Sequence, residues 1–295
     1  MAKDNVIYNT RRYLQKIALK VTSNEFMSKL YFWIILKEKL DFKNPTSFNE
    51  KIQWLKLYDY PNNPLVIQCA DKYAVREYIK EKGCSTYLNG LIGVWDKVDD
   101  INWNELPEKF VMKCNHGCGY NIICDNKSEL DIEEAKTKLT KWMKEDFGLF
   151  NAEPHYSKIP RKIICEEHLG DDIVDYKFFS FNGEPKFMYI AKGFGKGHNE
   201  RITFLDMDGN RAPFKRTDYD EIEGDFDAPQ TFSTMVELSR KLSENFTFVR
   251  VDFFEIGGKI YFSELTFTPN GGLMPFSPKN YDDYWGNMID LKGLR

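Results

Sequence analysis

Apolar positions in the first quarter of the chain recur with the period of an α-helix. They predict a helix over residues 6–40. Residues 47–50, Ser-Phe-Asn-Glu, form a capping box, in which the Ser and Glu side chains satisfy backbone N–H groups at a helix start. This box predicts a second helix that runs past Trp54 to Leu57. We therefore expect residues 1–66 to be an all-helical region.

After this region the pattern changes to short strands mixed with helices. A helix from Asp71-Lys72 to residue 82, closed by Gly83, precedes a strand at 110–114 and a returning strand at 122–124. Asn182-Gly183, a strong hairpin signal, joins two further strands. The remaining expected elements are a helix at 130–143, strands at 162–165, 176–181 and 184–191, a turn at Asp208-Gly209, a helix at 232–242 and strands at 246–254 and 260–267. Hairpins mixed with helices predict an α+β fold whose sheet is largely antiparallel.

The last hairpin contains the most informative polar residues. A three-residue turn at 257–259 would place Asp252 opposite Glu264. It would also place Arg250 opposite Thr266, on the same face. Two facing carboxylates repel unless a cation lies between them, and oxygen ligands suit Mg2+. The opposite face is expected to be core: Val249, Val251, Phe253, Tyr261, Leu265 and Phe267.

Two alternatives stay open for this hairpin. The four polar residues could form an exposed face on which Arg250 pairs with one carboxylate. A two-residue Gly-Gly turn would instead put Asp252 and Glu264 on opposite faces, because side chains alternate along a strand.

Lys113 is the second candidate for chemistry. It lies in the strand Phe-Val-Met-Lys-Cys and is followed at once by Asn-His-Gly-Cys-Gly. Glycine lets backbone N–H groups approach phosphate oxygens, and lysine supplies a positive charge. A lysine beside a glycine turn is also common in edge strands, so this signal is weak by itself. A zinc site is a further hypothesis, although the spacing of its ligands does not match paired motifs: Cys114, His116, Cys118 and Cys124.

Composition restricts the class of protein. The 295 residues carry a net charge of -4 without a basic stripe, which argues against nucleic-acid binding. The apolar run at 30–36 is too short to span a bilayer, and no signal-peptide pattern precedes it. We therefore expect a cytoplasmic protein. Its six cysteines are expected to be reduced thiols. Residues of the first helix could also form a membrane-surface face, although packing against the protein is more usual: Arg11, Arg12, Lys16, Ile17, Leu19 and Trp33.

Several short segments occur in an order and spacing that resemble the ATP-grasp fold. They are Asp71-Lys72, Lys113 before its glycines, Ile-Ile-Cys-Glu-Glu-His-Leu at 163–169, Asp-Tyr-Lys-Phe-Phe at 175–179, Arg250-Val-Asp252 and Glu264-Leu-Thr266. The segments 48–54, 113–117, 175–179 and 264–272 resemble the TupA-like branch more closely. The likeness extends from about residue 39 to residue 290.

The resemblance implies an ATP-grasp domain at 67–295, with two α+β subdomains at about 67–160 and 161–295 that grip ATP. By this likeness the phosphates and their lid involve Lys72, Lys113, Gly117, Gly119 and Lys177. The adenine hinge corresponds to Glu166, Glu167, His168 and Leu169. Mg2+ would be held by Asp252, Glu264 and Thr266, where the family usually has Asn at the last position. Arg250 would stabilise charge on the acyl carbon, and the substrate would meet Arg201, Asn270, Gly271 and Gly272.

The implied activity is an ADP-forming ligase that joins a small-molecule or glycan carboxylate to an amine, in the biosynthesis of a bacterial surface polysaccharide. Polysaccharide-assembly enzymes or a membrane surface are the other expected partners. An ATP-dependent sugar phosphotransferase and a non-catalytic scaffold are alternatives. A glycosyltransferase is a third alternative. Asp206-Met-Asp208 matches the Asp-x-Asp motif of such enzymes, although the adjacent Gly209 favours a turn there.

Overall fold

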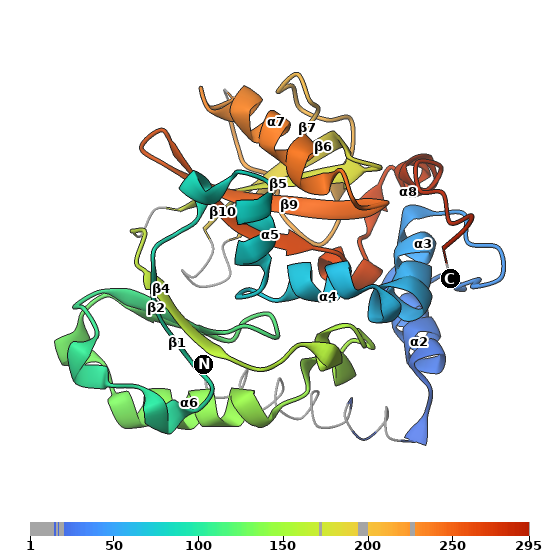
Figure 1. Ribbon diagram of the computed structural model, residues 1–295. Coiled ribbons are helices and arrows are strands. Elements are labelled where there is room, and N and C mark those ends of the chain that lie inside the picture. The colour runs from blue at the N-terminus through green and yellow to red at the C-terminus, as the bar shows by residue number, and fades with distance from the viewer. Residues whose placement is uncertain are drawn as a thin grey trace.

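Two antiparallel sheets form the centre of the molecule in the computed structural model (Figure 1). The structure describes Gln15, Ile17 and residues 21–170, 173–193, 200–224 and 228–294. Much of the suggested membrane-surface face, namely Arg11, Arg12, Lys16 and Leu19, lies outside these residues. Hairpins mixed with helices confirm the α+β class.

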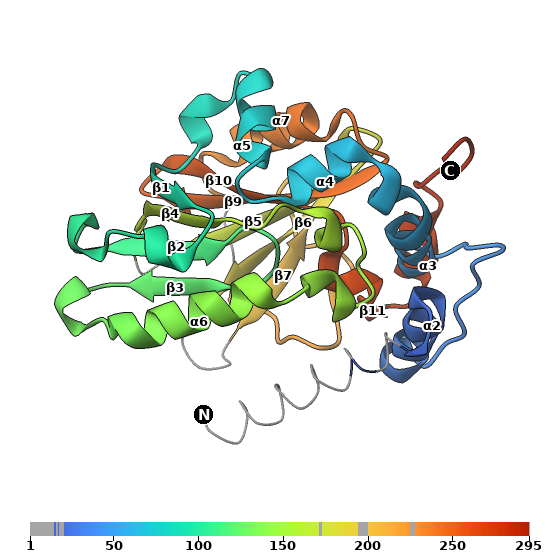
Figure 2. The same cartoon turned by 60° about the horizontal axis from the view of Figure 1, so that its bottom comes forward.

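The first sheet has four strands in the order β1-β4-β2-β3, and α6 (Ile132–Lys144) packs against it (Figure 2). Its strands are β1 (Leu91–Trp95), β2 (Phe110–Cys114), β3 (Asn121–Cys124) and β4 (Ile163–Glu167). Buried side chains such as Phe110, Met112 and Leu139 make a separate core between sheet and helix. The strand β4 pairs with β1 and β2, so it belongs to the first sheet. The chain therefore passes from the first sheet to the second after Glu167, and not between residues 160 and 161, where the two subdomains were expected to meet.

The second sheet has five strands in the order β10-β9-β5-β6-β7. They are β5 (Val174–Phe181), β6 (Glu184–Lys192), β7 (Arg201–Leu205), β9 (Phe248–Ile256) and β10 (Lys259–Thr266). Asn182 and Gly183 both have positive φ, at 49° and 82°, which confirms the predicted two-residue hairpin between β5 and β6. Helix α7 (Phe232–Ser243) covers one face through contacts such as Phe232 on Phe178.

The turn of the last hairpin differs from the prediction. Ile256 pairs with Lys259, so Gly257-Gly258 is a two-residue turn. By itself this turn would separate Asp252 from Glu264, but a bulge between Phe262 and Glu264 adds one residue and restores their pairing. The predicted cross-strand pairs are therefore confirmed. The shift also puts Phe262 in the core, at 6% exposure, in place of the expected Tyr261.

One face of the second sheet changes character along its strands. On β5, Asp175 and Lys177 share a face with Phe179 and Phe181, because side chains alternate. The aromatic half is buried, with Phe48 of the helix α3 (Phe48–Trp54) packed 5.0 Å from Phe248 between ring centroids. The polar half is left for the cleft between the sheets. This division places the functional residues at one end of an otherwise buried face.

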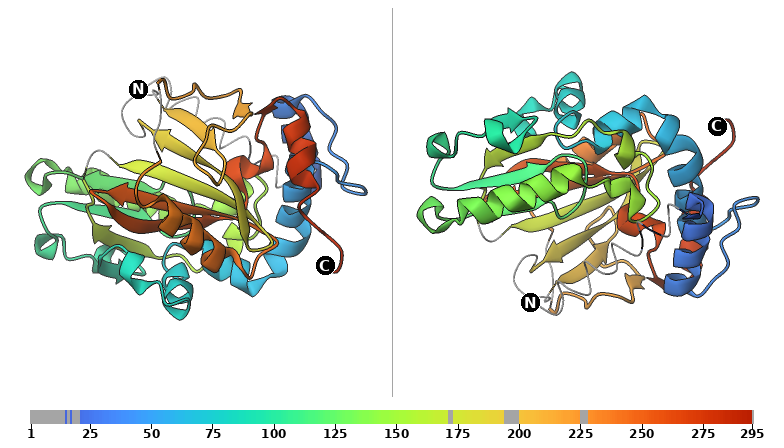
Figure 3. Two further views of the ribbon diagram at one scale, coloured as in Figure 1. Left: turned by 90° about the horizontal axis from the view of Figure 1, so that it is seen from above. Right: turned by 90° about the horizontal axis from the view of Figure 1, so that it is seen from below.

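Helices α2 (Asn24–Leu36) and α3 (Phe48–Trp54) gather with the last helix, α8 (Asn280–Gly286), at one end of the molecule (Figure 3). Helix α3 continues as a π-helix (Leu55–Asp59), and the chain then leads through α4 (Pro64–Ala70) and α5 (Val75–Glu81) along the second sheet (Figure 1). A small sheet pairs β8 (Lys215–Arg216) with β11 (Phe276–Ser277). The capping box at Ser47 and the positive φ of Gly83 confirm the predicted helix signals.

The helix expected over 6–40 is not continuous. The chain leaves helical conformation at Thr22 and Ser23, and the Ser23 side chain accepts from the Phe26 N–H to start α2. Serine is favoured at such a cap because it satisfies an N–H group that has no partner within the helix. No helix in the described part of the chain has the length and apolar character needed to cross a membrane.

Candidate functional site

A pocket opens where the two sheets face each other. It is lined by β2 and β3, by the segment after β4 and by the β9–β10 hairpin: Asn89, Val111, Lys113, Asn121, Ile123, Glu166, Glu167, His168, Leu169, Gly170, Ile173, Phe254, Phe262 and Ser263. Its wall combines apolar side chains with a few charged groups, the usual composition of a small-molecule site. The predicted hinge residues thus line one pocket together with Lys113.

Glu166 joins Lys113 to a residue that the sequence did not single out. Its carboxylate accepts from Lys113 Nζ at 2.7 Å and from Arg76 Nη1 at 3.1 Å. Arg76 Nη2 also donates to the backbone oxygen of Asn89 at 2.7 Å. Two cations thus flank this carboxylate, and Arg76 fixes its position. Lys72 and Arg76 are four residues apart at the start of one helix, a spacing that places both side chains on the same face. This spacing could have identified Arg76 as a neighbour of the site.

The hinge segment after β4 is held by side-chain hydrogen bonds. Asn89 Nδ2 donates to the backbone oxygen of Glu167 at 2.8 Å. The Gly170 N–H donates to His168 Nδ1 at 3.0 Å, and His168 Nε2 lies 2.8 Å from Asp125. These contacts give His168 a structural partner on each ring nitrogen. Leu169 lines the pocket, as expected for a residue that packs on a base.

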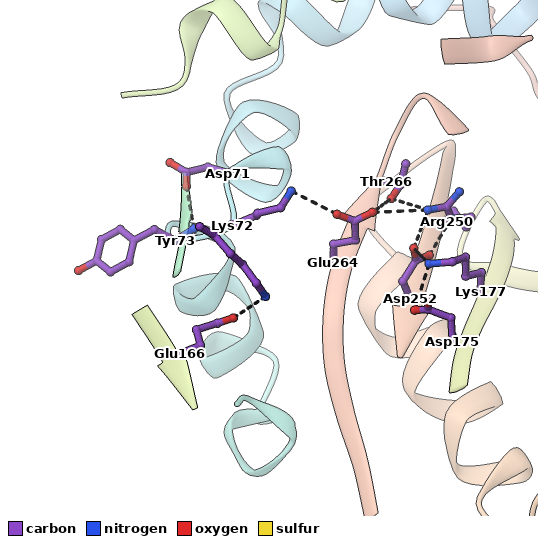
Figure 4. Close-up of polar contacts among 11 residues, drawn as sticks. Asp71, Lys72, Tyr73, Glu166, Asp175, Lys177, Arg250, Asp252, Glu264 and Thr266 are labelled. Atoms are coloured by element: carbon purple, nitrogen blue, oxygen red, sulfur yellow. Dashed lines mark hydrogen bonds and ion pairs between the residues drawn. The ribbon is translucent and has the colours of Figure 1, made fainter. Parts of the chain in front are cut away.

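A cluster of alternating charges lies on the cleft face of the second sheet (Figure 4). Arg250 holds Asp252 with two hydrogen bonds of 2.7 and 2.6 Å, and Lys177 donates to the same carboxylate at 3.0 Å. The Asp252 side chain is 0% exposed. Burial would lower the pKa of Lys177, but the carboxylates of Asp252 and Asp175 outweigh it and raise that pKa.

Glu264 stands beside this group and reaches across to Lys72 (Figure 4). Its carboxylate lies 3.3 Å from Lys72 Nζ and 3.5 Å from Arg250 Nη2, and it accepts from the Thr266 hydroxyl at 2.8 Å. Burial would raise the pKa of Glu264, but Lys72, Lys177 and Arg250 together lower it. Glu264 therefore stays anionic, which a metal ligand or a phosphate-site carboxylate must be.

The expected repulsion between the two carboxylates is relieved by protein cations. Lys72, Lys177 and Arg250 balance the charges of Asp175, Asp252 and Glu264 without a metal. The expected cation between the two carboxylates is therefore supplied by protein side chains, and their repulsion alone does not require a metal ion. The alternative for this hairpin is correct in pairing Arg250 with a carboxylate, that of Asp252. It is wrong in placing the polar residues on an exposed face, because Asp252 and Arg250 are buried.

The donor set still suits Mg2+. Glu264 and Thr266 offer oxygen ligands, and the Glu264 side chain is 32% exposed, so an ion can reach it. Asp252 differs, because both of its oxygens already accept from Arg250. Within the described ranges no group of three or more His, Cys, Asp or Glu residues converges as a metal site, and this includes the cysteines considered for zinc.

The glycine loop after β2 has a packed and an open part. Gly117 is buried, and a Cβ atom there would lie 2.7 Å from the Phe147 ring, whereas Gly119 has φ +74° and free space around it. Cys118 between them interacts electrostatically with Lys72 and Glu264. The loop that was predicted to be a lid therefore borders the charge cluster.

Asn115 connects the two predicted phosphate lysines. Its side chain donates to Asp71 at 2.8 Å, and its backbone oxygen accepts from the Lys72 N–H at 3.2 Å. Asn115 follows Lys113 by two residues and is fully buried. This contact sets the start of α5 against β2, so both lysines keep a fixed relation to each other.

Arg201 lies apart from this site. It begins β7, the strand at the opposite edge of the sheet from β10, and its guanidinium is 2.6 Å from Glu223. The structure gives no support to its suggested role in holding a substrate carboxylate. Asp206 accepts from the Asp208 and Asn210 N–H groups, so Asp206-Met-Asp208 forms a turn, as the adjacent glycine indicated.

The segment predicted to line the acceptor pocket follows β10 directly. Asn270, Gly271 and Gly272 have φ of 51°, 65° and 73°, three successive residues in the left-handed region. Glycine adopts this conformation without a steric penalty, so the sequence Asn-Gly-Gly suits it. The turn starts within four residues of Thr266, next to the cluster.

Among solved structures, the chain is similar to three amino-acid ligases. D-alanine–D-alanine ligase from Bacillus anthracis, complexed with ATP, is 15% identical with a TM-score of 0.41 over 68% of this chain and 55% of that one. L-amino acid ligase from Bacillus licheniformis is 13% identical with a TM-score of 0.42 over 70% and 42%. D-alanine–D-alanine ligase from Helicobacter pylori is 13% identical with a TM-score of 0.41 over 84% and 70%. This chain therefore spans about half the length of the first two, and such scores are too low to support a function.

No curated protein matches the chain. The model of the TupA-like ATPgrasp family matches residues 50–290, which is most of the sequence. The match includes all the residues of the charge cluster and of the pocket. It confirms the resemblance that the sequence motifs indicated, and the chain belongs to the TupA-like ATP-grasp family.

Proposed function

We propose that this protein is an ATP- and Mg2+-dependent ligase that joins a carboxylate to an amine with release of ADP and phosphate. The observation that supports this most is the charge cluster on β9 and β10 beside the pocket. There Glu264 and Asp252 face each other across the strands, and cations from three separate segments meet them. Family membership supports ATP as the nucleotide.

The proposed reaction has two steps. A substrate carboxylate oxygen attacks the γ-phosphorus of ATP, and the bond to the β–γ bridging oxygen breaks to give an acyl phosphate and ADP. The amine nitrogen then attacks the acyl carbon, phosphate leaves and the nitrogen loses a proton. Bound Mg2+, held by Glu264 with Thr266 and Asp252 beside it, would neutralise phosphate charge.

The side chains of the protein supply positioning and charge in this proposal. Lys72 and Lys113 would bind phosphate oxygens once ATP competes with their present carboxylate partners, Glu264 and Glu166. Arg250, held in place by Asp252, would stabilise the negative oxygen of the tetrahedral intermediate. No protein nucleophile is needed, so catalysis depends on orientation and on fixed charges.

The direct test measures products with a panel of sugar acids and amino acids plus amines. We expect ADP and free phosphate in equal amounts, together with an amide, from the wild type. A phosphotransferase would release ADP and no phosphate, since the phosphoryl group would stay on a hydroxyl. Stabilisation of the fold by UDP-sugars and not by Mg-ATP would favour the glycosyltransferase instead.

Membership of the TupA-like branch supports a polysaccharide precursor as one substrate. A uronic acid or an amino acid is the proposed carboxylate. Arg201 is left out of the acceptor site in this proposal because it pairs with Glu223.

We propose in addition that α2 contacts an anionic membrane surface. Phe26 and Trp33 are 55% and 58% exposed on this helix, and Lys37 Nζ lies 5.7 Å from the Trp33 ring. Aromatic and basic residues together are typical of helices that lie in a membrane interface. We expect the protein to sediment with phosphatidylglycerol vesicles and the Trp33→Ala variant to do so several-fold less. Equal sedimentation with phosphatidylcholine vesicles, or none with either, would contradict this.

A further inference from the structure

Helix α3 and the π-helix that continues it carry two stripes of buried side chains. Phe48, Ile52 and Leu55, four and three residues apart, pack in the main core. Asn49, Gln53 and Lys56 repeat the same spacing one position later and are also buried, at 0%, 0% and 1% exposure. Polar side chains are rarely buried this fully unless they are hydrogen-bonded. The second stripe therefore needs partners.

Those partners are backbone groups of the loop that follows β10, residues 268–274. Asn49 donates to the Met274 oxygen at 2.8 Å and accepts from the Met274 N–H at 2.7 Å. Gln53 Nε2 donates to the oxygens of Gly271 and Gly272 at 2.8 and 2.9 Å. Lys56 Nζ lies 3.3 Å from the Gly271 oxygen and 3.2 Å from the Asn151 oxygen, so it also ties the loop to the segment before residue 153. The whole polar stripe thus contacts one loop.

This loop needs external support for its shape. Asn270 to Gly272 all lie in the left-handed region, where ordinary helix or sheet hydrogen bonds cannot form. A Cβ atom on Gly272 would lie 2.9 Å from Ile52 and 3.0 Å from Gln53, so the backbone itself packs on α3. Inside the loop the Gly271 N–H donates to the Thr268 oxygen at 2.8 Å and Asn270 Nδ2 donates to the Leu273 oxygen at 2.6 Å, while the Thr268 hydroxyl donates to Glu153 outside it.

We propose that Asn49, Gln53 and Lys56 are positioning residues that hold the 268–274 loop in its functional conformation. Since their bonds take up the carbonyl oxygens of the loop, they fix which way its peptide groups turn. The loop continues the strand that carries Glu264 and Thr266, so this arrangement couples the amino-terminal helices to the proposed acceptor site. This part of the inference rests on the proposed ligase function. The amino-terminal helical region is then part of the active site and not an accessory.

The test compares three variants that keep side-chain volume but remove the donors. Gln53→Met and Lys56→Met lose their bonds to the loop. Lys51→Met is the matched control, since Lys51 lies on the same helix and donates to the Gly286 and Ile289 oxygens at 2.9 and 2.7 Å, away from the loop. Hydrogen exchange of the full chain is followed in peptides that cover residues 268–274 and, for comparison, 110–124.

We expect exchange in 268–274 to become about tenfold faster or more in Gln53→Met and Lys56→Met, from the loss of bonds to buried carbonyls. Exchange in 110–124, and the thermal stabilisation by Mg-ATP, should stay as in the wild type. With D-glucuronate and L-alanine as probes, KM for the acid should rise while KM for ATP stays constant. Lys51→Met should change none of these.

Unchanged exchange in 268–274, or the same acceleration in Lys51→Met, would overturn the inference. Gln53→Leu is a second variant, which removes the donor without adding a charge, if Gln53→Met does not fold. A wild type that releases no ADP with any acid would count against the ligase proposal alone. The exchange results would still decide whether α3 holds the loop.

Discussion

Asp252→Asn is expected to reduce ADP release by about a hundredfold or more, the size of effect seen when a fixed charge-stabilising group is lost. Asp252 holds Arg250 through two hydrogen bonds and Lys177 through a third, in a position with 0% exposure. Without its charge, Arg250 would lose the orientation that the tetrahedral intermediate needs. Initial rates of ADP release at saturating ATP measure this directly.

The same substitution should lower the free energy of unfolding by about 3–5 kcal/mol, because it removes the carboxylate charge that two buried cations share and leaves them only Asp175 and the more distant Glu264. Urea denaturation measures this loss. The double variant Arg250→Gln/Asp252→Asn should recover part of the stability while it stays inactive, which separates folding from catalysis.

Asp96→Asn is the matched control for Asp252. Asp96 pairs with Lys162 at 2.7 Å, but its side chain is 72% exposed, so less than about 1 kcal/mol should be lost. Wild-type rates in Asp252→Asn would show that the cluster does not take part in the reaction.

Lys113→Met is expected to weaken Mg-ATP binding by about a hundredfold, since a lysine facing phosphate supplies a full charge in a partly enclosed site. At an ATP concentration of about 100 times the wild-type Kd, stabilisation by the ligand should fall from about 2.7 to about 0.4 kcal/mol. The fold should survive, because Arg76 still pairs with Glu166. Thermal unfolding with and without Mg-ATP gives the measurement.

Lys109→Met serves as the control for charge removal next to the same strand, since Lys109 is exposed just before β2. It should respond to Mg-ATP as the wild type does. Full stabilisation of Lys113→Met by Mg-ATP would place the phosphates elsewhere. Loss of stabilisation in both variants would indicate a general effect of net charge.

Local signals in the sequence were sufficient for most elements. The capping box at Ser47 and the Asn182-Gly183 turn depend only on neighbouring residues, so both could be predicted without knowledge of the fold. The pairing of Asp252 with Glu264 was also correct. The pairing was reached from the wrong turn, however, because the bulge after Phe262 has no marker in the sequence.

The predicted site residues are only partly gathered by the structure. Lys72, Lys177, Arg250 and Glu264 meet in one cluster, while Lys113 and Glu166 line the adjoining pocket. In the sequence Arg201 looked as good a candidate as Arg250. It lies on β7, however, the edge strand opposite β10. Which arginine lies in the site depends on the order of the strands in the sheet. The alternation of polar and apolar residues within one strand does not predict that order.

The sequence alone determined the α+β class, the Asn182-Gly183 hairpin and the helix signals at Ser47 and Gly83, because each follows from backbone preferences over a few neighbouring positions. Only the tertiary structure decided how those charges are paired. Lys72 meets Glu264 across 192 positions, and Asn49 meets Met274 across 225. Such contacts form only when both sheets and α3 pack together, since burial removes water as a competing partner and makes each pairing specific.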